Sequence, residues 1–150
     1  MTPSLLSAGL LLGSLLLPQP AARPDGTVDF LRPDGSWITT ITVEIAETHE
    51  ARVRGLQGRR SIAPGTGMLF VYETPRPLGF WMRDTPVSLD IIYVGADMRI
   101  LNVRQRTRPM SDTRYPSAGP AMYVVEVPAG FAERFGIGTS SVIRVRRPAD

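Results

Sequence analysis

Aromatic, cationic and acidic side chains stand together in the stretch GFWMRDTPVSLDIIYV, residues 79–94. In an extended segment, alternation places Trp81 and Arg83 on the same face. An indole beside a guanidinium can stack on a sugar ring or another flat ligand, and the same pair also fits an aromatic core at a strand end. Asp84 and Thr85, which precede a proline, are also ordinary turn residues. The stretch therefore offers either a ligand site or a packed turn.

Two further acidic residues lie where the pattern predicts a buried strand face. Asp90 falls on the apolar face of LDIIYV, and Glu126 falls on the apolar face of AMYVVEV. A buried carboxylate needs a partner, because an unpaired buried charge is costly, and Arg54, Arg59 and Arg83 are the candidate cations. The two acids then form either an acid/base pair or hard-metal site in a pocket, or structural ion pairs that fix a helix onto the sheet.

The residue types that are missing exclude most familiar hydrolase mechanisms. The 150-residue chain has no cysteine and no lysine, so its 17 positive side chains are all arginines. Thiol nucleophiles, disulfides, thiolate metal sites and Schiff-base chemistry are thereby excluded. His49 is the single histidine, which rules out a zinc site with several histidine ligands. We expect no metal and no cofactor.

The first 22 residues contain no charged side chain and read as a secretory signal peptide. Residues 5–17 form an apolar run that is too short to span a bilayer comfortably, and small residues and prolines follow it. The alternatives are an uncleaved N-terminal anchor or a wrongly chosen start codon. We expect a periplasmic or secreted protein with no membrane span after cleavage.

The mature chain carries a modest positive charge, +3 over the full sequence. Arginine in place of lysine can favour anionic partners, or it can reflect a GC-rich genome. Arg104, Arg106 and Arg108 alternate along one expected strand and could face a polyanion. Nucleic acid is not expected outside the cytoplasm, and a charged edge strand explains the same pattern.

Residues 23–36, rich in proline, aspartate and glycine, are expected to be linker and turn, and residues 37–147 a single domain. Within it, residues 48–56 predict a short helix with Thr48 as N-cap and Gly55 as its end. A second short helix is expected in AGFAERFGIG, and a polar, proline-rich loop at residues 107–120. Strands are expected in WITTITVEIAE, at residues 68–72, 80–82, 89–94 and 98–106, and in AMYVVEV and SSVIRVRR.

Short strands separated by turns, together with two short helices, predict a mostly β domain of the α+β class. We expect a compact antiparallel sheet that is closed as a small barrel or sandwich.

Five segments in a fixed order resemble a known family: RVRGL, GTGMLFVY, FWMRDTPVSLDIIYV, RIL and YVVEVPAGF…FGI. They are similar to the bacterial and archaeal family named domain of unknown function 192, over residues 42–145. The resemblance implies a compact, strand-rich and often exported domain with no established activity. Asp84 stands where the family usually has asparagine, and Ser88 where it has proline. The family positions present in this chain are Arg54, Gly55, Leu56, Gly67, Met68, Phe70, Phe80, Trp81, Met82, Arg83, Thr85, Leu89, Asp90, Glu126 and Gly130.

Three functions remain open at this point. The first is an exported monomer that binds a small molecule or an envelope protein, with the loop at residues 107–120 as a rim over which Tyr115 closes. The second is a structural or interaction module in which Asp90 and Glu126 form ion pairs, and the third is a glycan hydrolase that uses these two acids. We favour binding over catalysis. The residues expected at the site are Arg54, Arg59, Trp81, Arg83, Asp84, Thr85, Asp90, Tyr115 and Glu126.

Overall fold

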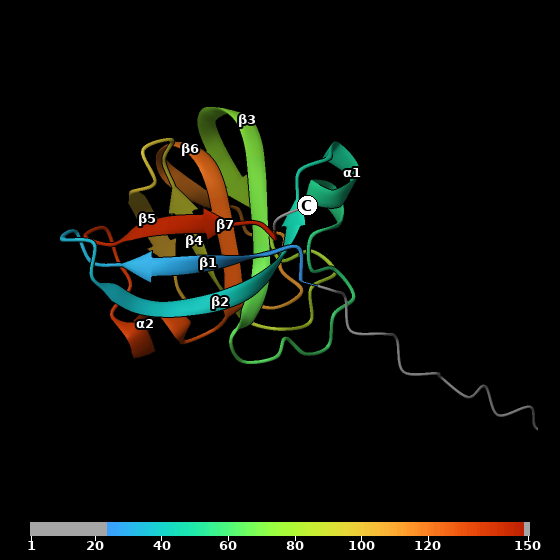
Figure 1. The fold of residues 1–150 in the computed structure, drawn as a ribbon. Helices are drawn as coiled ribbons and strands as arrows, with labels where there is room; N and C mark the ends of the chain where they lie inside the picture. Colours follow the sequence, from blue (N-terminus) through green and yellow to red (C-terminus); the bar gives the residue numbers. More distant parts are fainter. Residues whose placement is uncertain (1–23, 149–150) are drawn as a thin grey trace, which may run out of the picture.

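The computed structural model describes residues 24–148, which form one curled sheet and two short helices (Figure 1). The predicted signal peptide, residues 1–22, lies outside the described residues. In the described part the sheet has seven strands in the order β5-β4-β6-β3-β2-β1-β7. The elements are β1 (Gly26–Leu31), β2 (Trp37–Ala46), α1 (His49–Arg54), β3 (Thr66–Phe80), β4 (Leu89–Val94), β5 (Ile100–Arg104), β6 (Tyr115–Pro128), α2 (Phe131–Phe135) and β7 (Val142–Arg146).

The sheet is mixed and curls into a half-barrel. Strands β2 and β3 are parallel, and the other pairs are antiparallel. The parallel pair was not expected from the sequence, and it is possible because the chain between them crosses over through α1. The edges approach each other at one end, where the amide of Ile100 donates to the Ser141 carbonyl (3.1 Å) and the amide of Ile143 to the Met98 carbonyl (2.9 Å). The predicted mostly β, barrel-like fold is confirmed.

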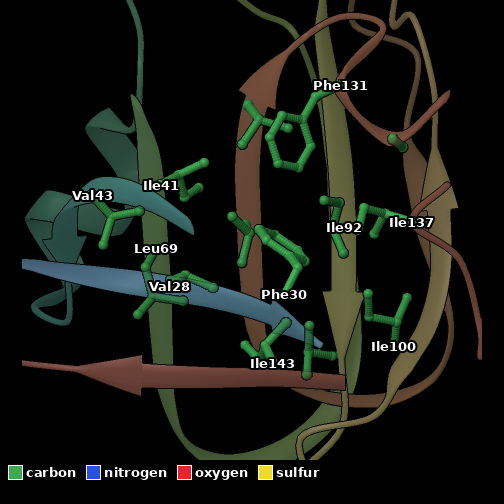
Figure 2. Close-up of a cluster of buried hydrophobic side chains, with 14 residues drawn as sticks. Val28, Phe30, Ile41, Val43, Leu69, Ile92, Ile100, Phe131, Ile137 and Ile143 are labelled. Carbon is green, nitrogen blue, oxygen red and sulfur yellow. The ribbon is translucent and has the colours of Figure 1, made fainter. Parts of the chain in front are cut away.

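The sheet buries apolar side chains on both of its faces. The inner cluster takes residues from all seven strands and from α2, and it fills the inside of the half-barrel (Figure 2). The outer cluster lies on the other face of β3, β4 and β6, beneath α1 and the segment after β3. Its largest members are Phe70, Met82, Leu89, Ile91 and Tyr93. Consecutive strand residues alternate between these two clusters, so each strand position belongs to one face or the other.

Three boundaries differ from the sequence prediction. The expected linker at residues 23–36 contains β1, which buries Val28 and Phe30 in the inner cluster. Strand β3 runs through the expected proline turn to Phe80, and it bends where its pairing with β6 shifts register. Strand β6 begins at Tyr115, so it takes the second half of the loop expected at residues 107–120.

Both short helices form as predicted. In α1 the Thr48 hydroxyl accepts a hydrogen bond from the Ala51 amide (3.1 Å), and Gly55 ends the helix with a positive φ of 47°. Helix α2 ends at Gly136, which is also left-handed. Neither helix in the described residues has the length and apolar character needed to cross a membrane.

Candidate functional site

A pocket of about 240 Å³ opens between α1 and the bent strand β3. Helix α1 and the loop that follows it form one wall, β3 and the segment after it form the other, and Glu126 of β6 also lines the pocket. Five of the residues expected at the site line this pocket: Arg54, Trp81, Arg83, Thr85 and Glu126.

A buried tyrosine supports the pocket wall that is formed by β3 and the segment after it. The hydroxyl of Tyr93 in β4 accepts from the Phe80 amide (3.2 Å) and donates to the Tyr115 carbonyl. Burial raises the pKa of Tyr93, so this hydroxyl stays protonated and able to donate. The Phe80 ring packs edge-on against Phe70, with centroids 4.9 Å apart. Phe80 is thereby fixed at the edge of the pocket.

Backbone contacts connect the loop after α1 to β3 and to the turn that follows β3. A Cβ at Gly55 would meet the Phe70 ring at 3.3 Å, so glycine allows the loop after α1 to lie close against the wall. Three residues later, the amide of Gly58 donates to the carbonyl of Asp84 (2.8 Å). Asp84 has a φ of 53°, a left-handed conformation that asparagine and aspartate adopt more readily than most residues. Aspartate at a position where the resembling family has asparagine therefore preserves the backbone turn.

Glu126 is the buried acid of the pocket. Only 4% of the residue is exposed, and the residues paired with it on the neighbouring strands, Met68 and Ile91, both belong to the outer cluster. Among the described residues, its side chain has no hydrogen-bond or ion-pair partner, and it is not sealed within the protein because it lines the pocket. Burial raises the pKa of Glu126 to about 8. The carboxyl group is therefore mostly neutral at pH 7, and it can both donate and accept a hydrogen bond.

The lining also contains four arginines: Arg52, Arg54, Arg76 and Arg83. The Arg52 guanidinium donates to two main-chain carbonyls and lies 4.8 Å from the centroid of the Tyr72 ring. The Arg76 guanidinium lies 4.9 Å from the same centroid. Within residues 24–148, Arg83 is the one member of this group that has a carboxylate partner. The pocket thus concentrates positive charge that nearby acids leave largely uncompensated.

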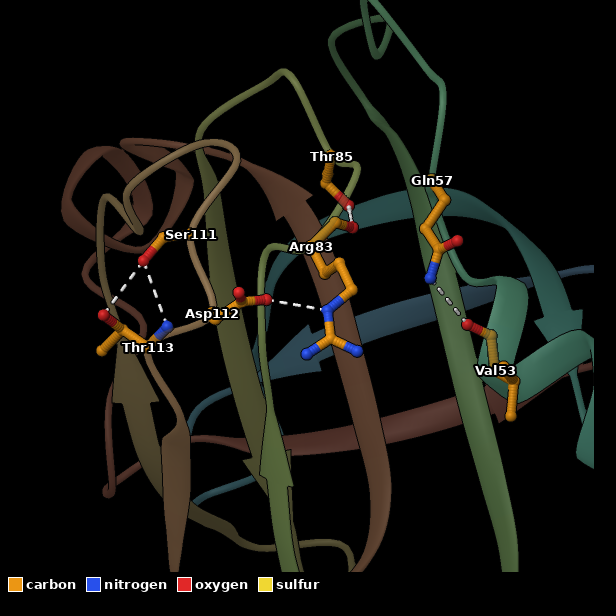
Figure 3. Close-up of polar contacts among 7 residues, drawn as sticks. All are labelled: Val53, Gln57, Arg83, Thr85, Ser111, Asp112 and Thr113. Atoms are coloured by element: carbon orange, nitrogen blue, oxygen red, sulfur yellow. Dashed lines mark hydrogen bonds and ion pairs between the residues drawn. The ribbon is translucent and has the colours of Figure 1, made fainter.

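Trp81 and Arg83 form the outermost part of the wall. The Arg83 guanidinium lies over the Trp81 indole, 4.3 Å from its centroid. Figure 3 shows the Nε of the same guanidinium donating to Asp112, at 2.7 Å. Trp81 keeps 42% of its surface exposed. Thr85, by contrast, is buried, and its hydroxyl donates to the Arg83 carbonyl (3.1 Å), which fixes the turn beneath the arginine.

Asp90 is not part of the pocket, and its expected pairing with Arg54 or Arg59 was wrong. Its carboxylate accepts three main-chain amides, from Arg106 (2.8 Å), Gly130 (3.1 Å) and Ala132 (2.9 Å). Asp90 is completely buried and fixes the start of α2 against the start of β4. Amide donors satisfy a buried carboxylate without any counter-ion.

The strand register separates Asp90 from Glu126. Asp90 is paired with Val127, a member of the inner cluster, whereas Glu126 is paired with Ile91 of the outer cluster. Directly opposed residues share a face and consecutive residues alternate, so the two carboxyl groups point to opposite sides of the sheet. They cannot flank one substrate bond, and the hydrolase hypothesis that used both acids fails.

Arg59 and Tyr115 also lie elsewhere than expected. Arg59 makes a bidentate pair with Glu44 on β2, with N–O distances of 2.6 and 2.7 Å, beside a second hollow. Tyr115 is a half-buried member of β6 whose hydroxyl accepts from the Arg108 amide (3.1 Å). It is therefore not free to close over the pocket. No residue of the expected rim at 107–120 lines the pocket. The segment lies directly behind lining residues: Asp112 pairs with Arg83, the Met110 amide donates to the Thr85 carbonyl (3.0 Å), and Tyr115 and Pro116 pair with β3 at Phe80 and Gly79.

Sequence reasoning missed Arg52, Tyr72 and Arg76 as pocket residues. Arg52 follows the N-cap of a predicted helix, and the other two lie near an expected turn, so nothing in the pattern connected them. Within residues 24–148, no three histidine, aspartate or glutamate side chains are grouped as a metal site would require.

Comparisons with known proteins place this architecture in a family. Residues 30–145 match DUF192, a family described as an uncharacterized ACR. A protein of unknown function from Novosphingobium aromaticivorans has 31% identity and a TM-score of 0.77, over 84% of this chain and 89% of that one. A protein from Sinorhizobium meliloti, described as a candidate transcription regulator, has 31% identity and a TM-score of 0.76, over 80% of this chain and 92% of that one. Among curated proteins, none matches the chain.

Proposed function

Because this chain belongs to the DUF192 family, whose activity is unknown, we propose a function from the pocket itself: an exported domain that binds a small anionic molecule between α1 and β3. The observation that carries the proposal is Glu126, a buried carboxyl group that lines the pocket with no partner among the described residues. The apolar leader at residues 1–22 supports export, and the ligand would then be met in the periplasm or outside the cell.

A carboxyl group at this position works against folding. Met68, Phe70, Ile91 and Val124 surround it in register or in the same cluster, and an apolar residue there would extend that cluster. Burial removes most of the water around this carboxyl group and disfavours its charged form, as its raised pKa reflects. Groups that oppose stability are typical of functional sites, and a buried acid with a perturbed pKa in a pocket is a standard candidate.

The arginines favour an anionic ligand. Arg54 and Arg76 are exposed and have no acidic partner within residues 24–148, so their charge is available at the pocket. A guanidinium presents donors in a planar fork that matches a carboxylate or phosphate with two parallel hydrogen bonds. An anion that enters this pocket would approach positive groups from both walls.

The size of the pocket limits the ligand. Its volume of about 240 Å³ lies below the range of roughly 300–1,000 Å³ that is common for pockets that hold drug-sized molecules. We therefore expect a ligand no larger than a monosaccharide or a single substituted ring.

An envelope protein is the second candidate for the same site. Val53 and Trp81 line the pocket and are exposed by 59% and 42%, an unusual exposure for two apolar residues at one opening. A partner that inserted an acidic side chain between them would use the same arginines. Such a partner would bind the isolated domain when small anions do not.

The test is titration calorimetry of the mature domain with benzoate, glucuronate and inorganic phosphate. We expect at least one anion to bind, and its affinity to fall about tenfold or more in the double variant Arg54→Gln/Arg76→Gln. Arg99→Gln, an exposed arginine in the turn between β4 and β5, is the matched control and should bind as the wild type does. If no anion binds at millimolar concentration, or if Arg99→Gln loses as much affinity, the proposal is wrong.

A further inference from the structure

We infer that the ligand is a small hydroxy or keto acid, whose carboxylate is bound by the arginines and whose uncharged oxygen is bound by Glu126. This inference rests on the function proposed above and specifies the chemistry of the ligand's two ends. It follows from the separation of charge within the pocket: guanidinium groups on the walls, and one isolated carboxyl group in an apolar setting.

Because Glu126 has no charged partner, the end of the ligand that contacts it, here called the inner group, should be uncharged. The residues aligned with it across β3 and β4 are Met68 and Ile91, and no arginine is close enough to form an ion pair with it. A neutral carboxyl group has one O–H donor and a carbonyl acceptor, and a hydroxyl group complements both. A second anion at this point would be buried without a counter-ion, which is strongly unfavourable.

A cationic inner group is the main alternative, because an ammonium ion would pair with an ionised Glu126. To reach it, the cation would have to pass the four arginines that line the same pocket. The field of these arginines opposes a cation and favours an anion. The same field gives the ligand its orientation, with the anionic end toward the guanidinium groups.

The body of the ligand lies against apolar walls. Leu56, Phe70 and Phe80 line the pocket between the charged groups, and Leu56 and Phe70 are almost fully buried. These side chains suit an aromatic ring or the carbon face of a sugar. An aromatic hydroxy acid and a sugar acid share the required chemistry, and the experiment separates them.

The experiment compares four probes of nearly the same shape by calorimetry at pH 6.5. The first, 4-(hydroxymethyl)benzoate, has both ends; 4-methylbenzoate lacks the inner oxygen, and benzyl alcohol lacks the carboxylate. The fourth, 4-(aminomethyl)benzoate, has a cationic inner group. One hydrogen bond typically contributes about tenfold in affinity. We expect the hydroxymethyl probe to bind about tenfold more tightly than the methyl probe, and glucuronate to exceed it if the natural ligand is a sugar acid.

Variants at Glu126 test whether this side chain contacts the hydroxyl group of the probe. Glu126→Gln keeps a donor and an acceptor, so it should retain the preference for the hydroxymethyl probe. Glu126→Leu removes both, so the two benzoates should bind equally.

The pH dependence provides a measurement that does not depend on the leucine variant folding. Affinity for the hydroxymethyl probe should fall above about pH 8 in the wild type, and stay level in Glu126→Gln. The charged and titratable groups around Glu126 come from three elements and one turn: His49, Arg52 and Arg54 on α1, Tyr72 and Arg76 on β3, Tyr93 on β4, and Arg83 in the turn after β3. His49 is the histidine that lines the pocket, and His49→Gln should leave the effect intact.

Two results would overturn the inference. Equal binding of the hydroxymethyl and methyl probes, with loss in Arg54→Gln/Arg76→Gln, would mean that the pocket binds anions without a contact from Glu126. The proposed function would stand in that case. Tighter binding of the aminomethyl probe, abolished by Glu126→Gln, would mean that Glu126 binds a cation as an ionised carboxylate.

Discussion

At the scale of the residue, the two buried acids of this domain have different environments. Asp90 accepts three main-chain amides, so its charge is satisfied within the fold. Glu126 has no partner in the described part of the chain, and it lines the pocket. We conclude that Asp90 serves the structure and that Glu126 is available to a ligand.

Replacement of Asp90 by asparagine should destabilise the domain. The new amide group would face main-chain N–H donors in place of one carboxylate oxygen, and each unsatisfied buried donor costs about 1–3 kcal/mol. We expect a loss of roughly 2 kcal/mol or more in urea unfolding. Asp97→Asn, an exposed carboxylate in the turn between β4 and β5, is the control and should change stability little. Equal small effects of both changes would contradict the role assigned to Asp90.

Sequence patterning located both acids on buried strand faces but did not show that the faces differ. Asp90 and Glu126 lie on separate strands, and the face that each one shares depends on the register between β4 and β6. Register is a tertiary property, because a shift of one residue exchanges the faces. The amide partners of Asp90 were equally invisible, since two of them come from the chain about 40 residues later.

At the scale of the element, α1 and the bent part of β3 create the pocket. Helix α1 has only six residues and buries none of them fully, so its position depends on its cap and on the loop that follows. The Thr48 hydroxyl is therefore important for the wall that carries Arg52 and Val53.

Thr48→Ala should weaken ligand binding more than it weakens the fold. Loss of an N-cap costs about 1 kcal/mol, and here the cost falls on a peripheral helix that forms a pocket wall. We expect faster amide exchange in α1 and a several-fold loss of affinity for the bound anion. Thr48→Ser keeps the hydroxyl group and should behave as the wild type. Unchanged exchange in α1 of the alanine variant would show that the cap does not hold the helix.

Prolines explain why parts of β3 and β6 were not predicted as strands. The segments TPRP and YPSAGP read as turns and loop, yet they belong to β3 and β6. Their pairing breaks register between Val71 and Arg76 and again between Pro77 and Gly79, which accommodates residues that cannot donate to a regular ladder. Regular strands such as β4, by contrast, were predicted to the residue.

At the scale of the whole molecule, the half-barrel depends on a strand that resembled a linker. Strand β1 lies between β2 and β7, and it brings Val28 and Phe30 into the inner cluster (Figure 1). Turn-forming residues on both sides concealed its short alternating pattern. Without β1, the terminal strand β7 would have no neighbour in the sheet order.

A chain that begins at Trp37 should therefore fail to fold. It lacks β1 and the pairing partner of β7, while a chain that begins at Pro24 retains every described strand. We expect cooperative urea unfolding, followed by circular dichroism, for the longer chain and no cooperative transition for the shorter one. Equal unfolding midpoints for the two chains would place the domain boundary at Trp37 after all.

The measurement that tests the central claim most directly is urea unfolding of Glu126→Gln against the wild type at pH 5 and pH 8.5. Because burial raises the pKa of Glu126 from 4.5 to about 8, the folded protein keeps a proton that the unfolded chain loses across this interval. Wild-type stability should therefore fall as the pH rises from about 4.5 to 8, by roughly 3–5 kcal/mol at most. Glutamine cannot ionise, so the variant should match the wild type at pH 5 and exceed it by a few kcal/mol at pH 8.5. If the variant is instead less stable than the wild type at pH 8.5, the ionised carboxylate has a partner within the fold, and Glu126 is not the free acid of a binding site.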